Sequence, residues 1–401
     1  MNIVLFDTRQ TIIAAILTLY LGKYLTRHSR FLRNFNIPDA VSGGVVASLF
    51  FGFCYVALNL QIEFSLQIRD VLLIVFFTTI GLSSKLKTLL EGGKPLLILL
   101  VTALVYLVLQ NSAGIAVASL LGLDPAIGIL TGSVSLSGGH GTAIAWAPIF
   151  ADYGIPNASE IGIANATFGL IIGGIVGGPI ARYLILKYQL QPVNEEEQLS
   201  VSIKHRQKNV KIDYDTMLNS LLVLGLTIGF GLQISVVIEA IGLNLPMFVA
   251  CLFAGIILTN TMPLLFKRFP WPTGTPTLAL ISDLSLGLFL CMSLMSLQLW
   301  TLVDVAGPIL ILVLVQFLLS TVYTIFLVFP VMGKDYNAAV IAAGYSGLTL
   351  GTTPTAIANM TAVTAHFGAA PQAFVILPLV GAFFIDIANA FAIQTFLNFL
   401  G

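Results

Sequence analysis

The sequence predicts an all-α polytopic membrane protein, built from two inverted-topology repeats that each contain five transmembrane helices and a re-entrant hairpin. The 401 residues are 57% hydrophobic and 9% charged, with a mean hydropathy of +0.97, whereas a soluble domain carries about 25% charged residues. Apolar windows long enough to cross roughly 30 Å of hydrocarbon recur along the chain. One glycine-rich polar segment interrupts this pattern in each half. Most of the chain therefore lies inside a bilayer.

Five apolar windows define an N-terminal repeat, residues 1–190, and five more define a C-terminal repeat, residues 216–401. Between them, residues 191–215 form the longest hydrophilic stretch, which we expect to be a cytoplasmic linker. The windows of the first repeat are 10–27, 37–60, 70–87, 94–121 and 160–186. Those of the second repeat are 216–242, 246–262, 279–302, 305–331 and 371–399.

Each repeat also has one segment that is too polar and too rich in glycine for an ordinary span, residues 126–150 and 336–366. The arms before the glycines would rise about 16 Å and about 15 Å as helices, at roughly 1.5 Å per residue, and so reach only the midplane. Lipid offers no hydrogen-bond partners, so broken backbone at this depth must be buried in protein or line a wet cavity. We expect two re-entrant hairpins; a full crossing with an unwound centre is the alternative.

Lysine and arginine follow the positive-inside rule if the N-terminus lies outside. In that topology sixteen Lys and Arg side chains fall in inner segments, and two, Arg9 and Arg69, fall in outer ones. The linker is then cytoplasmic, and both termini are periplasmic.

Short motifs recur at nearly constant offsets, as an internal duplication predicts. The Asn-Ile-Pro sequence ending at Pro38 matches Asn-Leu-Pro ending at Pro246, 208 residues later. Gly122-Leu-Asp124 matches Gly333-Lys-Asp335, 211 residues later, and Gly139 matches Gly351, 212 residues later. An odd number of spans per half makes the halves inverted. Inverted repeats with broken helices are the architecture of many secondary transporters, whose substrate site lies near the midplane.

The first candidate binding site is the tip of the first hairpin, where backbone amides, hydroxyls and an imidazole gather. A helix begins after the tip, and a helix N-terminus favours anions, so the tip could hold carboxylates while unwound carbonyls hold Na⁺. The tip residues are Ser137, Gly138, Gly139, His140, Gly141 and Thr142. His140 could relay protons or form a hydrogen bond that holds the tip. Close glycine-mediated helix packing is the alternative for the whole cluster.

The second hairpin repeats this chemistry around Pro354, a residue suited to a first helical turn. Its candidate residues are Gly351, Thr352, Thr353 and Thr355. Asn359 lies one turn after Thr355 on the same helical face.

Asp386 is an acidic residue in the middle of an apolar window, where it costs roughly 2.5–3.5 kcal/mol on insertion scales. Asn389 lies one turn later on the same face. Asp386 could ligate Na⁺, accept an ammonium group or carry a proton, or it could form a structural contact inside the bundle. Asn165 and Thr167 occupy a similar depth in the window 160–186.

These features favour a secondary transporter over other membrane protein classes. An intramembrane metalloprotease would need His-Glu-x-x-His, which does not occur, and a Ser137–His140 dyad would lie in a glycine-rich turn with nothing to orient it. Neither a repeated carbonyl filter nor acidic rings indicate a channel. Net charge is zero and no basic tract indicates a nucleic-acid partner. The three cysteines lie far apart in apolar runs and are expected to be core residues.

Three motifs closely resemble those of bacterial sodium/glutamate symporters of the ESS family. They are Ser137-Gly-Gly-His-Gly-Thr142, Gly351-Thr-Thr-Pro-Thr-Ala-Ile-Ala-Asn-Met360 and Val380-Gly-Ala-Phe-Phe-Ile-Asp-Ile-Ala-Asn389. The resemblance, which runs nearly end to end, implies Na⁺-coupled uptake of L-glutamate across the bacterial inner membrane, without covalent chemistry or a cofactor. It also implies a homodimer and an elevator motion. Coupling to protons, or uptake of another small carboxylate, is the alternative.

From tip position and polarity, we expect the two tips to hold the carboxylates, and Asp386 with Asn389 or Asn359 to hold Na⁺ or the ammonium group. One departure from the family pattern is Leu348-Thr-Leu-Gly-Thr352, where a more glycine-rich Gly-Leu-Gly-Ala is expected. It adds a hydroxyl at Thr349 or Thr352. Thr349 is therefore a third candidate ligand for Na⁺.

Overall fold

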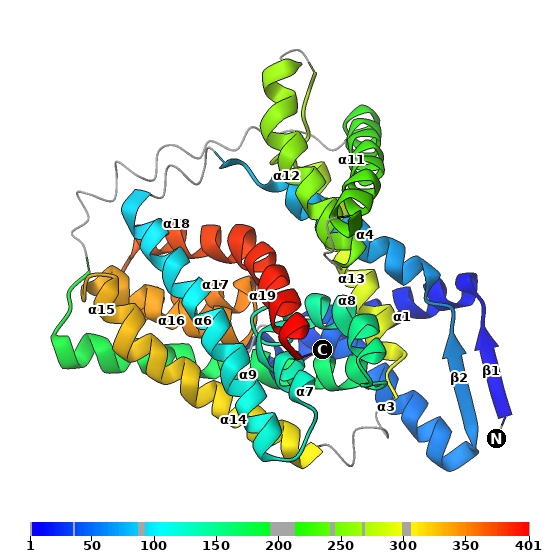
Figure 1. The fold of residues 1–401 in the computed structure, drawn as a ribbon, viewed down its shortest axis with the longest axis horizontal. Coiled ribbons are helices and arrows are strands. Elements are labelled where there is room, and N and C mark those ends of the chain that lie inside the picture. Colours follow the sequence, from blue (N-terminus) through cyan, green and yellow to red (C-terminus); the bar gives the residue numbers. More distant parts are fainter. Residues whose placement is uncertain are drawn as a thin grey trace. The chain divides into compact units, whose positions relative to one another are not determined.

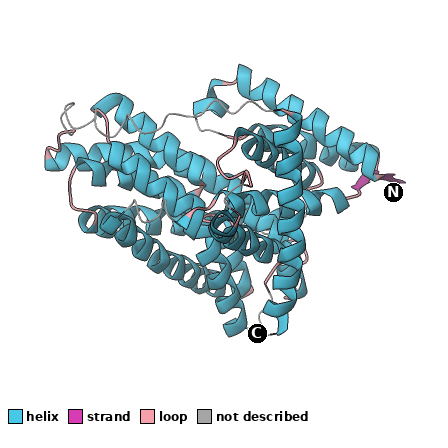
Figure 2. Cartoon of the chain, turned by 90° about the horizontal axis from the view of Figure 1, so that it is seen from above, coloured by secondary structure: helices cyan, strands magenta, loops and turns pink. Residues whose placement is uncertain are grey.

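Helices make up nearly all of the part of the chain that the structure describes, as the sequence predicts (Figure 2). The computed structural model describes residues 2–34, 37–86, 93–192, 213–240, 245–266, 269–298 and 306–400. Most of the predicted linker, residues 193–212, lies outside the described residues.

Every apolar window predicted from the sequence coincides with a helix. In the first half these are α1 (Thr8–His28), α3 (Asp39–Leu58), α4 (Gln67–Ser83), α6 (Gly93–Leu120) and α9 (Ala158–Tyr188), with a short α2 (Arg30–Asn34) after α1. In the second half they begin with α11 (Tyr214–Ala240), α12 (Met247–Leu265) and α13 (Pro276–Met295). The next window contains α14 (Ala306–Tyr323), the π-helix η3 (Thr324–Val328) and α15 (Phe329–Val331). The last contains α18 (Pro371–Leu379), the π-helix η4 (Val380–Phe384) and α19 (Ile385–Leu400).

Among the described residues, seven helical runs are long and apolar enough to cross a membrane: α3, α6, α9, α11, α12, α13 and the run from α14 to α15. The other three windows are helical but fall outside this set. α4 has 17 residues, α1 carries Arg9 and Lys23, and η4 interrupts the last window. The chain is therefore an all-α polytopic membrane protein.

Two short strands at the N-terminal end of the chain are a feature that the sequence reasoning missed. Strand β1 (Asn2–Phe6) pairs in parallel with β2 (Leu60–Phe64), with Val4 opposite Ile62 (Figure 1). β1 leads into α1, and β2 connects α3 to α4. The pairing therefore holds the start of α1 and the α3–α4 connection on the same side of the helices. Two five-residue strands are too short to stand out from flanking apolar windows, because a period-2 pattern needs length to be distinguished.

Both glycine-broken segments consist of a helix, a break and a second helix. The first has α7 (Pro125–Ile129), the π-helix η1 (Leu130–Val134) and α8 (Gly139–Asp152), and the second has α16 (Tyr336–Leu350) and α17 (Thr353–Phe367). We call residues 137–142 tip 1 and residues 351–355 tip 2. α17 folds back along α16, because a Cβ placed on Gly344 would lie 3.0 Å from Met360 Sδ, eight residues either side of the break. Each segment begins with an aspartate N-cap, Asp124 on Ala126 N–H and Asp335 on Ala338 N–H.

The helices group into two compact units, and each unit draws on both halves of the sequence. Unit 1 comprises Met1–Leu86, Ile144–Pro148 and Val210–Asp304, and thus holds α1 to α4 and α11 to α13. Unit 2 comprises Lys87–Ala143, Ile149–Asn209 and Val305–Gly401, and thus holds α6, α9, α14 to α19 and both tips. The candidate site can therefore be described within unit 2 alone.

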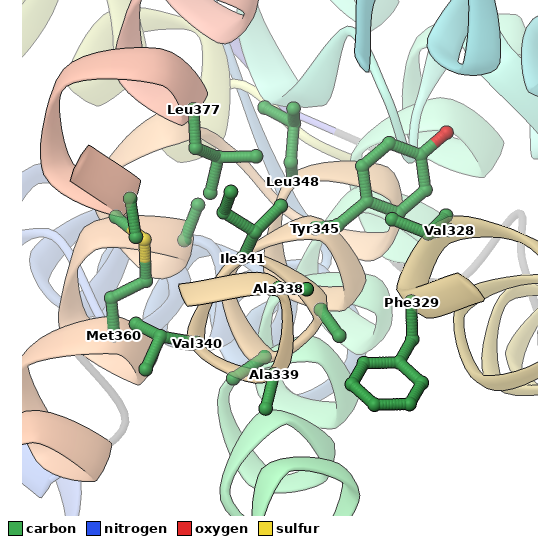
Figure 3. Packing of buried hydrophobic residues seen from close by; sticks show 14 of the residues in the cluster. Val328, Phe329, Ala338, Ala339, Val340, Ile341, Tyr345, Leu348, Met360 and Leu377 are labelled. Atoms are coloured by element: carbon green, nitrogen blue, oxygen red, sulfur yellow. The ribbon is translucent and has the colours of Figure 1, made fainter. Parts of the chain in front are cut away.

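The core of unit 2 is built around α16, every residue of which is buried. Leu348, Tyr345 and Ile341 of α16 lie among Val328, Met360 and Leu377 from three other elements (Figure 3). A helix that is apolar all round must be enclosed by other helices or by lipid. Here other helices of the protein enclose α16. The C-terminal end of α16 leads into tip 2, which therefore lies in the interior of the unit.

Candidate functional site

The two tips meet inside unit 2. A Cβ placed on Gly139 of tip 1 would lie 2.8 Å from Cγ2 of Thr352 in tip 2. Gly139 also has a φ of +70°, a left-handed conformation that glycine adopts without steric cost. Two segments separated by 212 residues in sequence therefore come into contact at the points where both helices break.

Each tip begins a helix that lacks a side-chain cap. α8 follows Gly138, which has no side chain to offer, and α17 follows Thr352, whose hydroxyl makes no capping bond. The first amides of a helix have no partner within it and carry partial positive charge. Nearby, Thr355 Oγ1 is buried and has no protein partner among the described residues. Two uncapped helix N-termini and an unpaired hydroxyl make this a place where an anion can bind.

Helix α9 lies against both tips and has glycine where they approach. A Cβ on Gly169 would lie 2.3 Å from Leu136 Cδ2, just before tip 1, and 2.3 Å from the Leu350 carbonyl oxygen, just before tip 2. Because the clash with Leu350 would involve a backbone atom, rotating a side chain could not relieve it. Gly169 therefore sets how closely α9 and the two tips pack.

His140 is buried at 5% exposure and its Nε2 lies 3.0 Å from Thr167 Oγ1 on α9. The Thr167 hydroxyl donates its own proton to the Ile163 carbonyl at 2.8 Å. A hydroxyl has a single proton, so it must accept from His140 Nε2–H. This contact holds tip 1 to α9, in line with the hydrogen-bonded role considered for His140.

The backbone of η1, just before tip 1, is held by asparagine side chains from three helices. Ser133 N–H donates to Asn111 Oδ1 of α6 at 3.0 Å, and Ser133 C=O accepts from Asn389 Nδ2 of α19 at 2.9 Å. Asn165 Nδ2 of α9 donates to Thr131 C=O at 2.8 Å. The Oδ1 atoms of Asn389 and Asn165 and the Oγ of Ser133 are buried without a protein partner among the described residues. Unpaired buried oxygens are costly unless a ligand, ion or water completes them.

Asp386 lies in the first turn of α19, directly after η4, and is half-buried. η4 itself packs against tip 2, because a Cβ on Gly381 would lie 2.7 Å from Thr353 Oγ1. Asn389, one turn after Asp386, donates to the Ser133 carbonyl, in the backbone just before tip 1. Together, η4 and the start of α19 therefore contact both broken segments. The midpoints of these two segments are more than 200 residues apart in the sequence.

Two further predicted residues have their polar groups occupied by protein. Thr349 Oγ1 lies 2.7 Å from Ser320 Oγ and donates to the Tyr345 carbonyl at 3.0 Å. Asn359 Nδ2 donates to the Gly173 carbonyl of α9 at 2.8 Å. Both side chains thus join helices of unit 2 to one another.

The other residues of tip 1 lie at the break or in the first turn of α8. Ser137 Oγ donates to Gln110 Oε1 at 2.6 Å, and Gly138 N–H donates to Ser133 C=O at 2.9 Å. Gly141 is half-buried and Thr142 is buried. Ser137 and His140 thus have different partners, Gln110 and Thr167, so the nucleophile and base of a hydrolase dyad do not meet.

The sequence reasoning missed four buried polar residues that line the inside of unit 2: Gln110, Asn111, Gln316 and Ser320. A signal was present, because Gln110 and Asn111 are adjacent amides within a mostly apolar 28-residue helix. Uncharged amides cost less in a membrane than charges do, but each still needs a partner inside the bundle. Treating uncharged amides in apolar windows as candidate site residues, as was done for Asp386, would have identified the glutamines and Asn111.

The arrangement suits binding rather than covalent chemistry. Within the described residues no group of three or more His, Cys, Asp or Glu side chains is placed to hold a metal ion. The polar groups of the tips are backbone amides and carbonyls, hydroxyls and the His140 imidazole, and Asp386 lies in the first turn of α19. Such oxygens suit hard cations such as Na⁺, and the helix N-termini suit carboxylates.

Comparison with known proteins agrees with this chemistry. The family model for the sodium/glutamate symporter matches residues 4–369. The chain is 40% identical to sodium/glutamate symporters of Escherichia coli (strain K12) and Shigella flexneri over 399 residues, which cover 98% of this chain and 97% of each relative. A sodium/glutamate symporter of Haemophilus influenzae is 39% identical over 389 residues, 96% of both chains. With matches of this extent, the chain belongs to the sodium/glutamate symporter family, whose members are transporters and not enzymes.

Proposed function

We propose that this protein takes up L-glutamate across the bacterial inner membrane, driven by Na⁺, through an elevator-type alternating-access mechanism. The observation that carries the proposal is the contact between the two tips in the interior of unit 2, where Gly139 meets Thr352. That contact brings two uncapped helix N-termini together. The substrate named for the relatives, glutamate, has two carboxylates, which two helix N-termini can receive.

The carboxylates are assigned to the residues of both tips. Tip 1 offers Ser137 to Thr142, and tip 2 offers Gly351, Thr352, Thr353 and Thr355. Thr355 is the strongest single assignment, because its buried Oγ1 has no protein partner among the described residues and lies in the first turn of α17. Asn359 is bonded to α9 through its Nδ2, and in this scheme it positions α17 for binding.

Na⁺ is cargo here, and Asp386 and Asn389 are its proposed ligands. Asn389 Oδ1 is buried and unpaired while its Nδ2 is bonded to Ser133. A carbonyl-type oxygen fixed in this way is a suitable Na⁺ ligand, and Asp386 one turn away supplies a negative charge. Thr349, the third candidate, has its hydroxyl bonded to Ser320 and Tyr345, so it ranks behind the other two.

The inverted repeat and the re-entrant character of both broken segments belong to the same proposal. Support comes from equivalent positions with the same local structure. Asp124 and Asp335 both cap the first helix of a broken segment. Pro38 and Pro246 precede α3 and α12 with nearly identical backbone angles, φ of −57° and −56°. Duplication of one unit would give helices with the same local structure at equivalent positions in both halves.

The elevator motion and the homodimer are supported by how the helices are grouped. Both tips belong to one compact unit, which is what a moving transport domain needs. In unit 1, α11 has 22% of its most apolar stretch buried, against 39% or more for the other spanning helices. A helix this exposed faces lipid or a second copy of the chain, and we assign it to the dimer interface.

The orientation places both termini in the periplasm and the linker in the cytoplasm. The β1–β2 pairing supports one part of it, because it holds the N-terminus and the α3–α4 connection on the same side. A cysteine at exposed Glu63 should react with an impermeant thiol reagent in spheroplasts, and one at exposed Lys85 should not. The reverse labelling pattern would overturn the orientation.

The deciding experiment is uptake of labelled L-glutamate into proteoliposomes that contain purified protein. An inward Na⁺ gradient, with a K⁺ gradient as control, is expected to drive accumulation above equilibrium. Equal uptake under a proton gradient would favour proton coupling and make Asp386 or His140 the proton carrier. Na⁺-driven uptake of another small carboxylate but not glutamate would change the substrate. No uptake of either, from folded protein, would refute the proposal.

A further inference from the structure

Gln110, a residue of α6 outside both tips, touches both broken segments with one side chain. Its Oε1 accepts a hydrogen bond from Ser137 Oγ at 2.6 Å, and its Nε2 donates to the Thr349 carbonyl at 3.0 Å. Gln110 is fully buried. A primary amide presents an acceptor and a donor in one plane, so it can complete both contacts at once.

The two contacts are made at equivalent positions of the two repeats. Ser137 lies two residues before Gly139, and Thr349 lies two residues before Gly351, so the bonded positions are 212 residues apart. Ser137 is the first residue of tip 1, and Thr349 lies in the last turn of α16, just before tip 2. One side chain therefore links tip 1 to the end of the helix that leads into tip 2.

Helix α14 also contacts α6 and α16 near this link. Gln316 Nε2 donates to the backbone carbonyl of Gln110 at 2.8 Å, and Ser320 Oγ lies 2.7 Å from Thr349 Oγ1. Gln316 itself makes no hydrogen bond to either broken segment among those the structure records for described residues. The two glutamines are equally buried but differ in what they contact: the Gln110 side chain bonds to both broken segments, whereas the Gln316 side chain bonds to the backbone of α6.

We propose that Gln110 is a positioning residue that sets the separation of the two tips and so pre-organises the substrate site. This inference rests on the proposed function, because it assumes that the tips bind the substrate. Because Gln110 is fully buried, moving its side chain away from either segment would leave its own polar group and that of its partner unpaired, so the bridge resists separation. A site held in its bound geometry binds more tightly because less ordering is needed on binding.

The test compares two matched substitutions, Gln110→Met and Gln316→Met. Each replaces a fully buried glutamine by an apolar side chain of similar length, and each leaves buried partners unpaired. Melting temperatures should fall by similar amounts. Glutamate binding at saturating Na⁺ should weaken about tenfold in Gln110→Met, equivalent to about 1.4 kcal/mol, and change less than about twofold in Gln316→Met. Equal weakening in both variants would mean a structural role and overturn the inference.

Gln110→Asn covers the case in which Gln110→Met does not fold. Asparagine keeps the buried amide but is one methylene shorter, so it cannot reach Ser137 and the Thr349 carbonyl together. We expect folded protein with glutamate affinity lowered about as much as in Gln110→Met. Wild-type affinity in Gln110→Asn would show that the bridge is not needed.

A substrate-free measurement separates this inference from the proposed function. Spin labels at exposed Tyr153 and Thr361, beyond the tips on the second arms, report the distance between the two segments. The distance distribution should be narrow in otherwise wild-type protein and in Gln316→Met, and clearly broader in Gln110→Met. If wild-type protein binds no glutamate, the proposed function fails, and this measurement still decides the role of Gln110. An unchanged width would overturn it.

Discussion

Asn389 Nδ2 donates to the carbonyl of Ser133 at 2.9 Å, although 256 residues of chain separate the two. The same carbonyl accepts the N–H of Gly138 at the start of tip 1. Ser133 follows Gly132, whose φ of −91° and ψ of −121° are non-helical, so the backbone departs from helical geometry at this point. The last helix of the chain thus supports the backbone from which tip 1 begins, with the amide oxygen of Asn389 left free for a ligand.

Replacing Asn389 by leucine should weaken Na⁺ activation of glutamate uptake. The change removes the proposed ligand oxygen and one of the two hydrogen bonds to the Ser133 carbonyl, a net loss of about 1 kcal/mol. The half-saturating Na⁺ concentration should rise about tenfold or more, as measured by uptake at varied Na⁺. The matched control is Gln394→Leu on the same helix, whose buried amide bonds to Asn398. A similar rise in that control would remove Na⁺ binding as the explanation.

Asp386→Asn should uncouple transport from Na⁺. The substitution keeps the size and one oxygen but removes the charge that would balance the ion in a medium of low polarity. We expect glutamate uptake to lose its dependence on the Na⁺ gradient and to fall at least tenfold. Asp283→Asn in unit 1, an exposed position on α13, serves as the control and should transport normally. Normal Na⁺ dependence in Asp386→Asn would exclude the carboxylate as a ligand.

A methyl group on Gly169 should disrupt the packing of α9 against both tips. In Gly169→Ala the new Cβ would lie 2.3 Å from the Leu350 carbonyl oxygen, so backbone must move, at a cost of about 1–3 kcal/mol. Thermal unfolding should occur at a lower temperature, and glutamate uptake per folded molecule should fall sharply. Gly178→Ala on the same helix meets nothing within 4 Å and should be neutral or slightly stabilising. Normal uptake by Gly169→Ala would contradict the close contact.

His140→Gln should keep most of the Na⁺-driven uptake. Glutamine can still donate to Thr167 Oγ1, the contact that His140 makes through Nε2. It cannot relay protons near neutral pH, so the substitution separates a hydrogen-bonding role from a proton-relay role. Uptake within about threefold of wild type is expected for His140→Gln, whereas His140→Ala, which leaves Thr167 without a donor, should lose at least one net hydrogen bond of about 1 kcal/mol. Complete loss of activity in His140→Gln would favour the relay.

Much of the fold could be predicted from the sequence because it depends on local patterns. All ten apolar windows contain helices, and both glycine-rich segments break where glycines occur. Asp124 and Asp335 each cap a helix, and Pro38 and Pro246 each precede one. Hydropathy and helix-start signals depend on only a few consecutive residues, so they can be recognised without knowing which residues lie nearby in the folded structure.

The sequence indicated which polar residues to expect at the two tips but not which side chains connect them. The tip residues were identified by their polarity in an apolar context, yet Gln110, Asn111 and Gln316 were not. The grouping of helices into two units that each combine both halves was also beyond the sequence, which divides the chain at its linker.

The sequence by itself therefore determined that the chain is a membrane bundle of helices with two broken polar segments, because lipid selects composition and length directly. Only the tertiary structure decided that Gly139 meets Thr352, that Asn389 supports Ser133, and that Thr349 is occupied by Ser320. Those outcomes depend on which buried polar group finds which partner. In a bilayer every such group must be satisfied by another part of the protein, and the partners here lie up to 256 residues away.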